Sequence, residues 1–236
     1  MNNMLARISD GRTDLVFDYV SQGNPATSKD EKDVALIQWC AYYGDVSAIR
    51  FLLSRGESLD TLVPGRGIGA AAFHGHWQLV EFLLENGADA NFTWPTTGET
   101  PLHSAVCSTE RRAQAHLVTQ VLLAHGADPN RKTKAGAETG AFMRDVRTCG
   151  ETPLHRAAAF ADEDTIQLLI DHGAQIDAKD ANGDSPLSWA SRHERRTSVL
   201  LKLCYGDFRV NPERTSLGSY LLGKPHAQAQ PKKRPV

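Results

Sequence analysis

Residues 152–173, TPLHRAAAFADEDTIQLLIDHG, have the features of two short helices joined by a turn. Thr152 can cap the first helix with its side-chain oxygen, and Pro153 occupies the next position without leaving an amide hydrogen unpaired. The run IQLLI gives the second helix an apolar stripe. Gly173 can adopt the left-handed conformation that is favoured at a helix C-terminus. The stretch therefore predicts one helix–turn–helix unit.

These features recur along the chain with a period near 33 residues. The helix opening is repeated as TPLH at 100–103 and as SPLS at 185–188. The glycines that end the second helices are separated by steps of 33, 31, 39, 47 and 33 residues, and they are Gly23, Gly56, Gly87, Gly126, Gly173 and Gly206. Such a period is typical of repeat proteins in which each unit packs against its neighbours.

Together with ENGADAN (85–91), AHGADPN (124–130) and DHGAQID (171–177), these openings resemble the ankyrin repeat, over about residues 5–206 as six units. The resemblance implies an all-α repeat solenoid: a stack of about six helix–turn–helix units with hairpin loops and one long loop insertion. It also implies that the histidine of TPLH ties the hairpin loop to the helix. We expect a capping unit at 1–33, five repeats at 34–206 with the insertion at about 131–150, and a C-terminal cap followed by a disordered basic tail at 207–236.

The stretch PGRGIGAAAFHGHW, 64–77, has Gly65, Gly67 and Ala70 at the G-x-G-x-x-A spacing of a dinucleotide-binding turn. It stands where TPLH would open the third unit, and no buried strand precedes it as a nucleotide site of that kind requires. We therefore predict a helix start without a nucleotide, weakened by its glycines. The second unit opens with ALIQ, 35–38, and also lacks the Thr and His, so we predict a softer N-terminal half.

The sequence contains no catalytic or metal-binding signature. His74-Gly75-His76 lacks further ligands at a recognisable spacing, the four cysteines are far apart, and G-x-S-x-G, phosphate-loop and H-E-x-x-H motifs are missing. We therefore expect a protein that is not an enzyme and that uses no cofactor or metal.

The composition is that of an ordinary globular protein, with 41% hydrophobic residues, 23% charged residues and a formal charge of −2. This charge gives no reason to expect a nucleic acid or an anionic membrane as the partner. No apolar run reaches the length of about 18 residues that a membrane span needs. We expect a monomer in the cytoplasm, with the nucleus as an alternative because Lys232-Lys233-Arg234 resembles a short import signal.

Ankyrin-like stacks usually bind other proteins on a concave surface lined by the first helices and the loop tips. Aligning the units puts many aromatic residues there, and aromatic and arginine side chains often dominate interface energies. The candidate contact residues of the repeats are Trp39, Tyr42, Tyr43, Phe73, His74, Trp94, Arg156, Phe160 and Trp189. Packing between adjacent units is the alternative role for each aromatic side chain.

Two steps exceed the period. The 39-residue step holds five extra residues around 107–116, which we expect to lengthen a second helix, and the 47-residue step holds 14 extra residues within 131–150. A long loop without a packing role is uncommon, so this loop predicts a projecting finger or a cover, with Phe142, Met143, Arg144 and Arg147 as contact residues. Residues 131–149 carry a balance of +3, which predicts an acidic contact. A disordered insertion is the alternative.

The leading hypothesis is a non-catalytic adaptor or inhibitor that captures another protein or peptide on the concave face and the 131–150 loop. The first alternative is a small-molecule or anion sensor, in which the loop closes over the groove and Arg144, Arg147 and Arg156 hold the anion. The second alternative is an enzyme whose site no motif discloses.

Overall fold

The computed structural model describes residues 4–107, 112–139 and 147–204. The chain divides into two units, Met1–Leu203 and Cys204–Val236, and every described helix lies in the first. The α-helices are α1 (Met4–Ser9), α2 (Leu15–Ser21), α3 (Leu36–Tyr43), α4 (Val46–Ser54), α5 (Ile68–His74), α6 (Trp77–Glu85), α7 (Pro101–Ala105), α8 (Arg112–Ala124), α9 (Pro153–Phe160), α10 (Glu163–Asp171), α11 (Pro186–Arg192) and α12 (Thr197–Lys202). Short 3-10 turns occupy Leu59–Thr61 (η1) and Gly65–Gly67 (η2).

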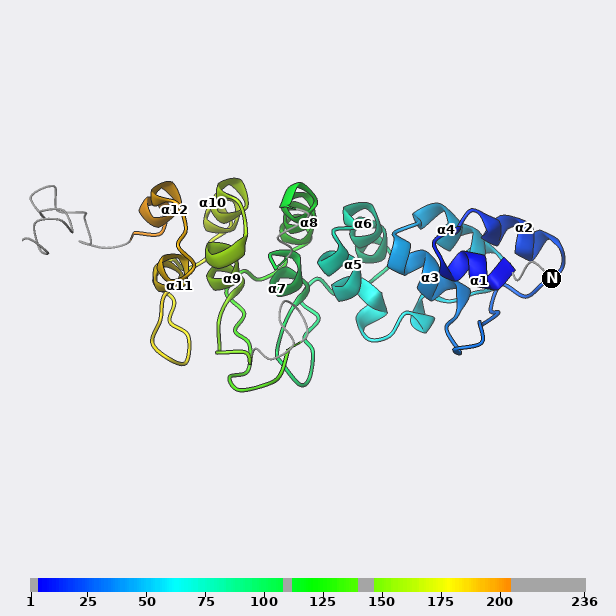
Figure 1. The fold of residues 1–236 in the computed structure, drawn as a ribbon, viewed down its shortest axis with the longest axis horizontal. Coiled ribbons are helices and arrows are strands. Elements are labelled where there is room, and N and C mark those ends of the chain that lie inside the picture. Colours follow the sequence, from blue (N-terminus) through cyan, green and yellow to red (C-terminus); the bar gives the residue numbers. More distant parts are fainter. Residues whose placement is uncertain (1–3, 108–111, 140–146, 205–236) are drawn as a thin grey trace, which may run out of the picture. The chain divides into compact units, whose positions relative to one another are not determined.

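Within Met1–Leu203 the helices form pairs that stack in chain order (Figure 1). Each odd-numbered helix packs against the even-numbered helix that follows it, and successive pairs meet through contacts such as α5 with α7 and α6 with α8. The loops between pairs project from the side of the odd-numbered helices. Among the described residues, two isolated β-bridges are the only β structure. The predicted all-α solenoid of helix–turn–helix units is confirmed.

The TPLH openings cap helices and link neighbouring loops. In α7, Nδ1 of His103 accepts a hydrogen bond from the backbone N–H of Thr100 at 3.1 Å, and Nε2 lies 3.2 Å from the carbonyl oxygen of Glu151. A carbonyl only accepts, so Nε2 carries the proton. His155 in α9 repeats this arrangement with Thr152 and the carbonyl of Asp184. The role that the family resemblance gives to these histidines is confirmed.

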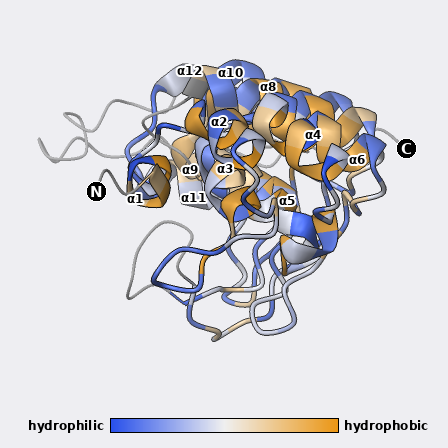
Figure 2. Ribbon diagram, turned by 90° about the vertical axis from the view of Figure 1, so that its right-hand side faces the viewer, coloured by the Kyte–Doolittle hydropathy of each residue, from blue (hydrophilic) through white to orange (hydrophobic). Residues whose placement is uncertain are grey.

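Small residues let neighbouring first helices approach closely. Ala71 and Ala72 of α5 and Ala157 and Ala158 of α9 are all buried. The even-numbered helices contribute larger side chains to the same core, such as the buried Leu79 of α6. Figure 2 shows that the projecting loops are mostly hydrophilic by comparison. The core therefore runs between the two layers of helices and leaves the loops available for other contacts.

The extra residues near 107–116 lengthen a second helix, as predicted. Helix α8 has 13 residues, whereas α6 and α10 have 9 each. None of the helices in the described part of the chain is long and apolar enough to cross a membrane.

Candidate partner-binding groove

The glycines at the start of α5, Gly65 in the preceding turn and Gly69 within the helix, make room for two aromatic side chains of the next hairpin loop. A β-carbon added at Gly69 would lie 1.5 Å from Cη2 of Trp94, and one added at Gly65 would lie 2.7 Å from the ring of Phe92. The two rings contact each other edge to face, with centroids 5.1 Å apart. The predicted helix start at this stretch is confirmed, because α5 begins at Ile68. Gly65 and Gly69 thus serve the packing of the two rings.

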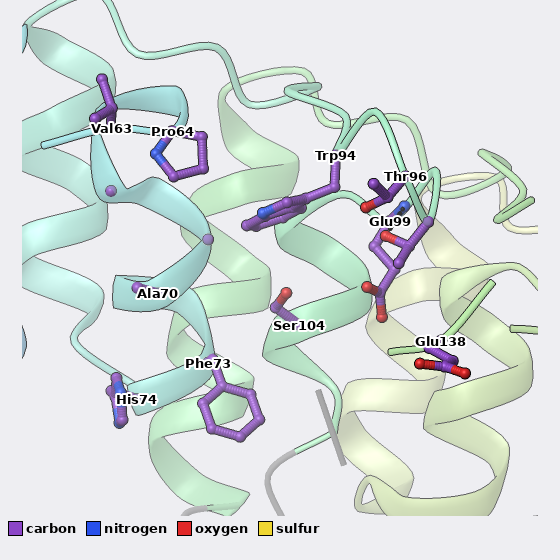
Figure 3. Close-up of a pocket in the computed structure, with 13 residues that line it drawn as sticks. Val63, Pro64, Ala70, Phe73, His74, Trp94, Thr96, Glu99, Ser104 and Glu138 are labelled. Carbon is purple, nitrogen blue, oxygen red and sulfur yellow. Dashed lines mark hydrogen bonds between the residues drawn. The ribbon is translucent and has the colours of Figure 1, made fainter. Parts of the chain in front are cut away.

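A hollow of about 480 Å³ lies between α5, this hairpin loop and the base of the insertion (Figure 3). Trp94 reaches into it from the loop, and Phe73 comes from α5. Two carboxylates, Glu99 and Glu138, lie on the side of the insertion. We call this space the large hollow. Its walls combine aromatic rings with acidic groups.

A second hollow of about 180 Å³ adjoins the first and is mainly apolar. Tyr42 and Leu62 line it, and it shares Val63, Ala70 and His74 with the large hollow. Tyr42 is 52% exposed and Val63 is 72% exposed, so both side chains offer apolar surface at the small hollow. We call this second space the small hollow and the two spaces together the groove. The groove runs across the second, third and fourth helical pairs.

A buried ion cluster forms the floor beside the large hollow. Nη1 of Arg156 lies 2.7 Å from Oε1 of Glu99, and its Nε donates to Oε1 of Glu151 at 2.9 Å. The side chain of Arg156 is 0% exposed, and those of Glu151 and Glu99 are 1% and 9% exposed. Burial opposes the charged form of Glu151, but Arg156 and the Thr133 hydroxyl outweigh it and hold the pKa of Glu151 below its usual range.

The same cluster fastens the insertion to the stack. The hydroxyl of Thr133 donates to Oε2 of Glu151, and the hydroxyl of Thr139 donates to Oε1 of Glu99, both at 2.7 Å. The backbone N–H of Cys149 also donates to Oε2 of Glu151. Both ends of the insertion are therefore anchored on the two carboxylates that pair with Arg156.

Arg156 corrects one expectation. The alignment of units put Arg156 on the exposed concave surface, where it would hold a partner or an anion, but the side chain is fully buried. Its guanidinium forms ion pairs with the carboxylates of Glu99 and Glu151. Its role in this structure is to link the fourth and fifth helical pairs.

The basic side chains in the described part of the insertion also have partners. Arg147 pairs with the carboxylate of Glu138 at 2.9 Å, and Arg131 lies 3.5 Å from that of Asp128. Lys132 and Lys134 donate to the carbonyl oxygens of Lys179 and Pro95. The reason for expecting an acidic contact is weaker than the charge balance suggested, and that contact stays a prediction.

Trp39 and Trp189 hold the hairpin loops of their own units. The indole N–H of Trp39 donates to Oδ2 of Asp30, and that of Trp189 donates to Oδ2 of Asp180. In both cases the aspartate lies nine positions earlier in the chain. This shared spacing was available in the sequence and would have indicated the structural contact.

The other predicted residues fall into three groups. Tyr42, Phe73, His74 and Trp94 meet at the groove, where the rings of Tyr42 and His74 lie 5.0 Å apart. Tyr43 packs toward the N-terminal pair and donates to the carbonyl of Ser9, whereas Phe160 contacts His193 near the other end of the stack. Phe142, Met143 and Arg144 lie outside the described residues.

The carboxylates of the ion cluster were missed by sequence reasoning. The pentapeptide ETPLH occurs at 99–103 and again at 151–155, so each TPLH opening is preceded by a glutamate. Arg156 follows the second copy directly. The repeated glutamate was a usable signal, because a carboxylate buried beside a helix start needs a cation or hydrogen-bond donors to compensate its charge. Among the described residues, no group of three or more His, Cys, Asp and Glu side chains could hold a metal ion.

Comparison with known proteins gives the same architecture. The family described as Ankyrin repeats (3 copies) matches residues 37–133 and 135–213. Neurogenic locus notch homolog protein 1 of Xenopus tropicalis is 32% identical over 217 residues, which are 88% of this chain and 7% of that protein. Human Rabankyrin-5 is 30% identical over 128 residues, 53% of this chain and 10% of that protein. Human Palmitoyltransferase ZDHHC13 is 23% identical over 213 residues, 81% of this chain and 34% of that protein.

The chain thus spans about a third or less of the length of these relatives. Ankyrin repeats generally mediate protein–protein interactions, and the family is generally non-catalytic. With its periodic helix openings, its stacked helical pairs and a family match over most of its length, this chain belongs to the ankyrin-repeat family.

Proposed function

We propose that this chain is a non-catalytic interaction module, an adaptor or inhibitor, that binds a segment of another protein in the groove. The observation that carries the proposal is the contiguity of the two hollows beside partly exposed Tyr42, Phe73 and Trp94. Aromatic side chains at a concave surface supply large contact areas at a low cost in conformational entropy. The chain acts as a cytoplasmic monomer in this proposal, and sedimentation of the purified protein measures the monomer part.

A substitution in the shared wall of the groove tests this proposal. Ala70 is exposed on α5 and lines both hollows, so Ala70→Arg would fill them without disturbing the core. Ala113→Arg, at an exposed position of α8, introduces the same charge and bulk away from the groove. In affinity capture from the source-cell lysate, Ala70→Arg loses the proteins that the unaltered chain and Ala113→Arg retain. Equal capture by all three chains would reject the groove.

The insertion is the second proposed contact, through Phe142, Met143, Arg144 and Arg147. Replacing residues 140–146 by Gly and Ser at unchanged length keeps the bridge between Glu138 and Arg147 and the bond from Thr139 to Glu99. The finger hypothesis expects this replacement to weaken partner capture while the thermal unfolding midpoint stays within a few degrees. Unchanged affinity would assign the insertion a structural role only.

The anion-sensor alternative requires three arginines to hold the anion, and one of them, Arg156, is not accessible. Arg156 is buried between two carboxylates, and Arg147 is paired with Glu138. The charged side chains among the described residues of the large hollow are themselves acidic, Glu99 and Glu138. These charges disfavour a small anion in the groove, so the protein-binding proposal is preferred.

A further inference from the structure

We propose that the large hollow receives a basic side chain, Lys or Arg, from the partner segment, and that the small hollow receives an apolar side chain close to it in that segment. The inference rests on the proposed function and names the chemistry of the partner. It also differs from the acidic partner that the charge of the insertion predicted.

The charge of the large hollow is the first argument. Glu99 and Glu138 are the charged residues that the structure places in its described lining. Glu138 is paired with Arg147, and Glu99 and Glu151 share the guanidinium of Arg156, so these described carboxylates and guanidiniums together carry a formal charge of −1. A cation entering the hollow would compensate this charge in a partly desolvated place, where water screens it less than at an open surface.

The aromatic walls are the second argument. A Lys or Arg side chain has an apolar stem and a charged head, and it prefers a site that offers apolar surface and acidic groups together. Trp94 and Phe73 supply the apolar surface beside the carboxylates, and an indole face also attracts a cation. Gly69 leaves room for the indole at this place, because a β-carbon there would overlap Trp94. The wall is thus built into the fold.

The shared wall is the third argument. Val63, Ala70 and His74 line both hollows, so the two spaces are adjacent. The small hollow is lined by Tyr42 and Leu62 and by Ala70 and Ala71 of α5, and these side chains suit an apolar group. One extended segment can therefore place an apolar and a basic side chain in the two hollows at once.

A peptide selection with the full chain separates this inference from the proposed function. Random twelve-residue peptides displayed on phage are selected on the unaltered protein and rescreened on Ala70→Arg and Ala113→Arg. The inference expects peptides enriched in Lys or Arg near an apolar residue, bound by Ala113→Arg and lost by Ala70→Arg. Neutral or acidic peptides that Ala70→Arg still blocks would overturn the inference and keep the groove. Selection of no peptides, or only of peptides insensitive to Ala70→Arg, would count against both.

The selected peptide then gives a sharper test. Replacing its basic residue by citrulline, or by norleucine for a lysine, removes the charge at nearly constant size and should weaken binding about tenfold or more. Glu138→Gln should weaken the basic peptide and leave the uncharged peptide unchanged, whereas Glu85→Gln, an exposed site on α6, should change neither. Equal affinity of the charged and uncharged peptides would refute the inference. The Trp94 indole signal, assigned by Trp94→Phe, should shift in NMR spectra when the basic peptide binds.

Discussion

Gly69 shows how one missing side chain shapes the groove. Its helical position would favour alanine by about 1 kcal/mol if helix propensity alone decided. A β-carbon at Gly69 would lie only 1.5 Å from the Cη2 atom of the Trp94 ring. The sequence therefore keeps a poor helix former at this position so that an aromatic wall can pack there.

We predict that Gly69→Ala lowers the free energy of unfolding. Overpacking costs typically about 1–3 kcal/mol, which exceeds the gain in helix propensity. In a Trp94→Ala background the same change should instead stabilise the protein, because the obstructing ring is gone. Urea unfolding of the unaltered chain, the two single variants and the double variant measures the change in unfolding free energy in both backgrounds. The idea fails if Gly69→Ala stabilises the protein with Trp94 in place.

Arg156 gives the second prediction at this scale. Arg156→Met leaves the carboxylates of Glu99 and Glu151 buried without their cation, which should cost about 3–5 kcal/mol of unfolding free energy. Arg192→Met removes the exposed arginine of the pair with Asp184 and should cost less than about 1 kcal/mol. Chemical denaturation at pH 7 compares them, and similar losses for both variants would refute the account of the cluster.

At the scale of the helical element, the openings of the first helices differ in how well they are fastened. Helices α7 and α9 begin with Thr and Pro, and their histidines reach the next loop. Helix α5 begins after Arg66 and Gly67, both at positive φ, and has no side-chain cap. Non-glycine residues avoid positive φ, so the start of α5 is strained.

Hydrogen exchange should reveal this difference. The uncapped start and the helical Gly69 together cost about 1–2 kcal/mol, so the amides of α5 should exchange about tenfold faster than those of α9. Amide exchange followed by NMR or mass spectrometry gives both rates in one sample. Equal protection of the two helices would contradict the predicted softness of the third unit.

The capping histidines should make stability depend on pH. Burial, with Arg156 nearby, lowers the pKa of His103, and burial lowers that of His155. The unfolded chain then binds protons more readily, so the stability from neutral histidines is complete above about pH 6.5 and is lost as pH falls below it. For His103 the loss should be about 1 kcal/mol at pH 5.5.

His103→Gln is the matched variant for this effect. Gln38 occupies the equivalent position of α3, and its side chain accepts from the backbone N–H of Ala35. The variant keeps a cap without a titrating group, so its stability should fall less between pH 7.5 and 5.5 than that of the unaltered chain. Parallel losses in urea titrations at the two pH values would show that His103 is not responsible.

At the scale of the whole stack, the sequence predicts the repeats well because each unit carries its own signals. Thr100, Pro101 and the glycine after each second helix act within a few residues, so their effect is local. The burial of Arg156 depends instead on Glu99, 57 positions earlier, and on a carboxylate from its own opening. Alignment of the units predicts which positions of the first helices face the concave surface, but the neighbouring loop decides whether a side chain at such a position is exposed.

The groove was predicted only in part for the same reason. The exposure of Tyr42, Phe73 and His74 in the groove follows from their positions in the aligned units. The position of Trp94 depends instead on Gly69 in the preceding unit. Glu99 and Glu138 were not among the predicted contact residues, although both line the large hollow. The chemistry of the groove therefore arises between units.

The central claim is that a partner lies in the groove. A photoreactive benzoylphenylalanine in place of Tyr42, which is 52% exposed and keeps an aromatic ring at the small hollow, compared with one at position 113, tests it most directly in the source-cell lysate. The account predicts an adduct of defined mass from position 42, absent from position 113, whose cross-linked peptide maps to a single segment of the partner. Adducts from position 113 alone, or equally from both positions, would contradict it.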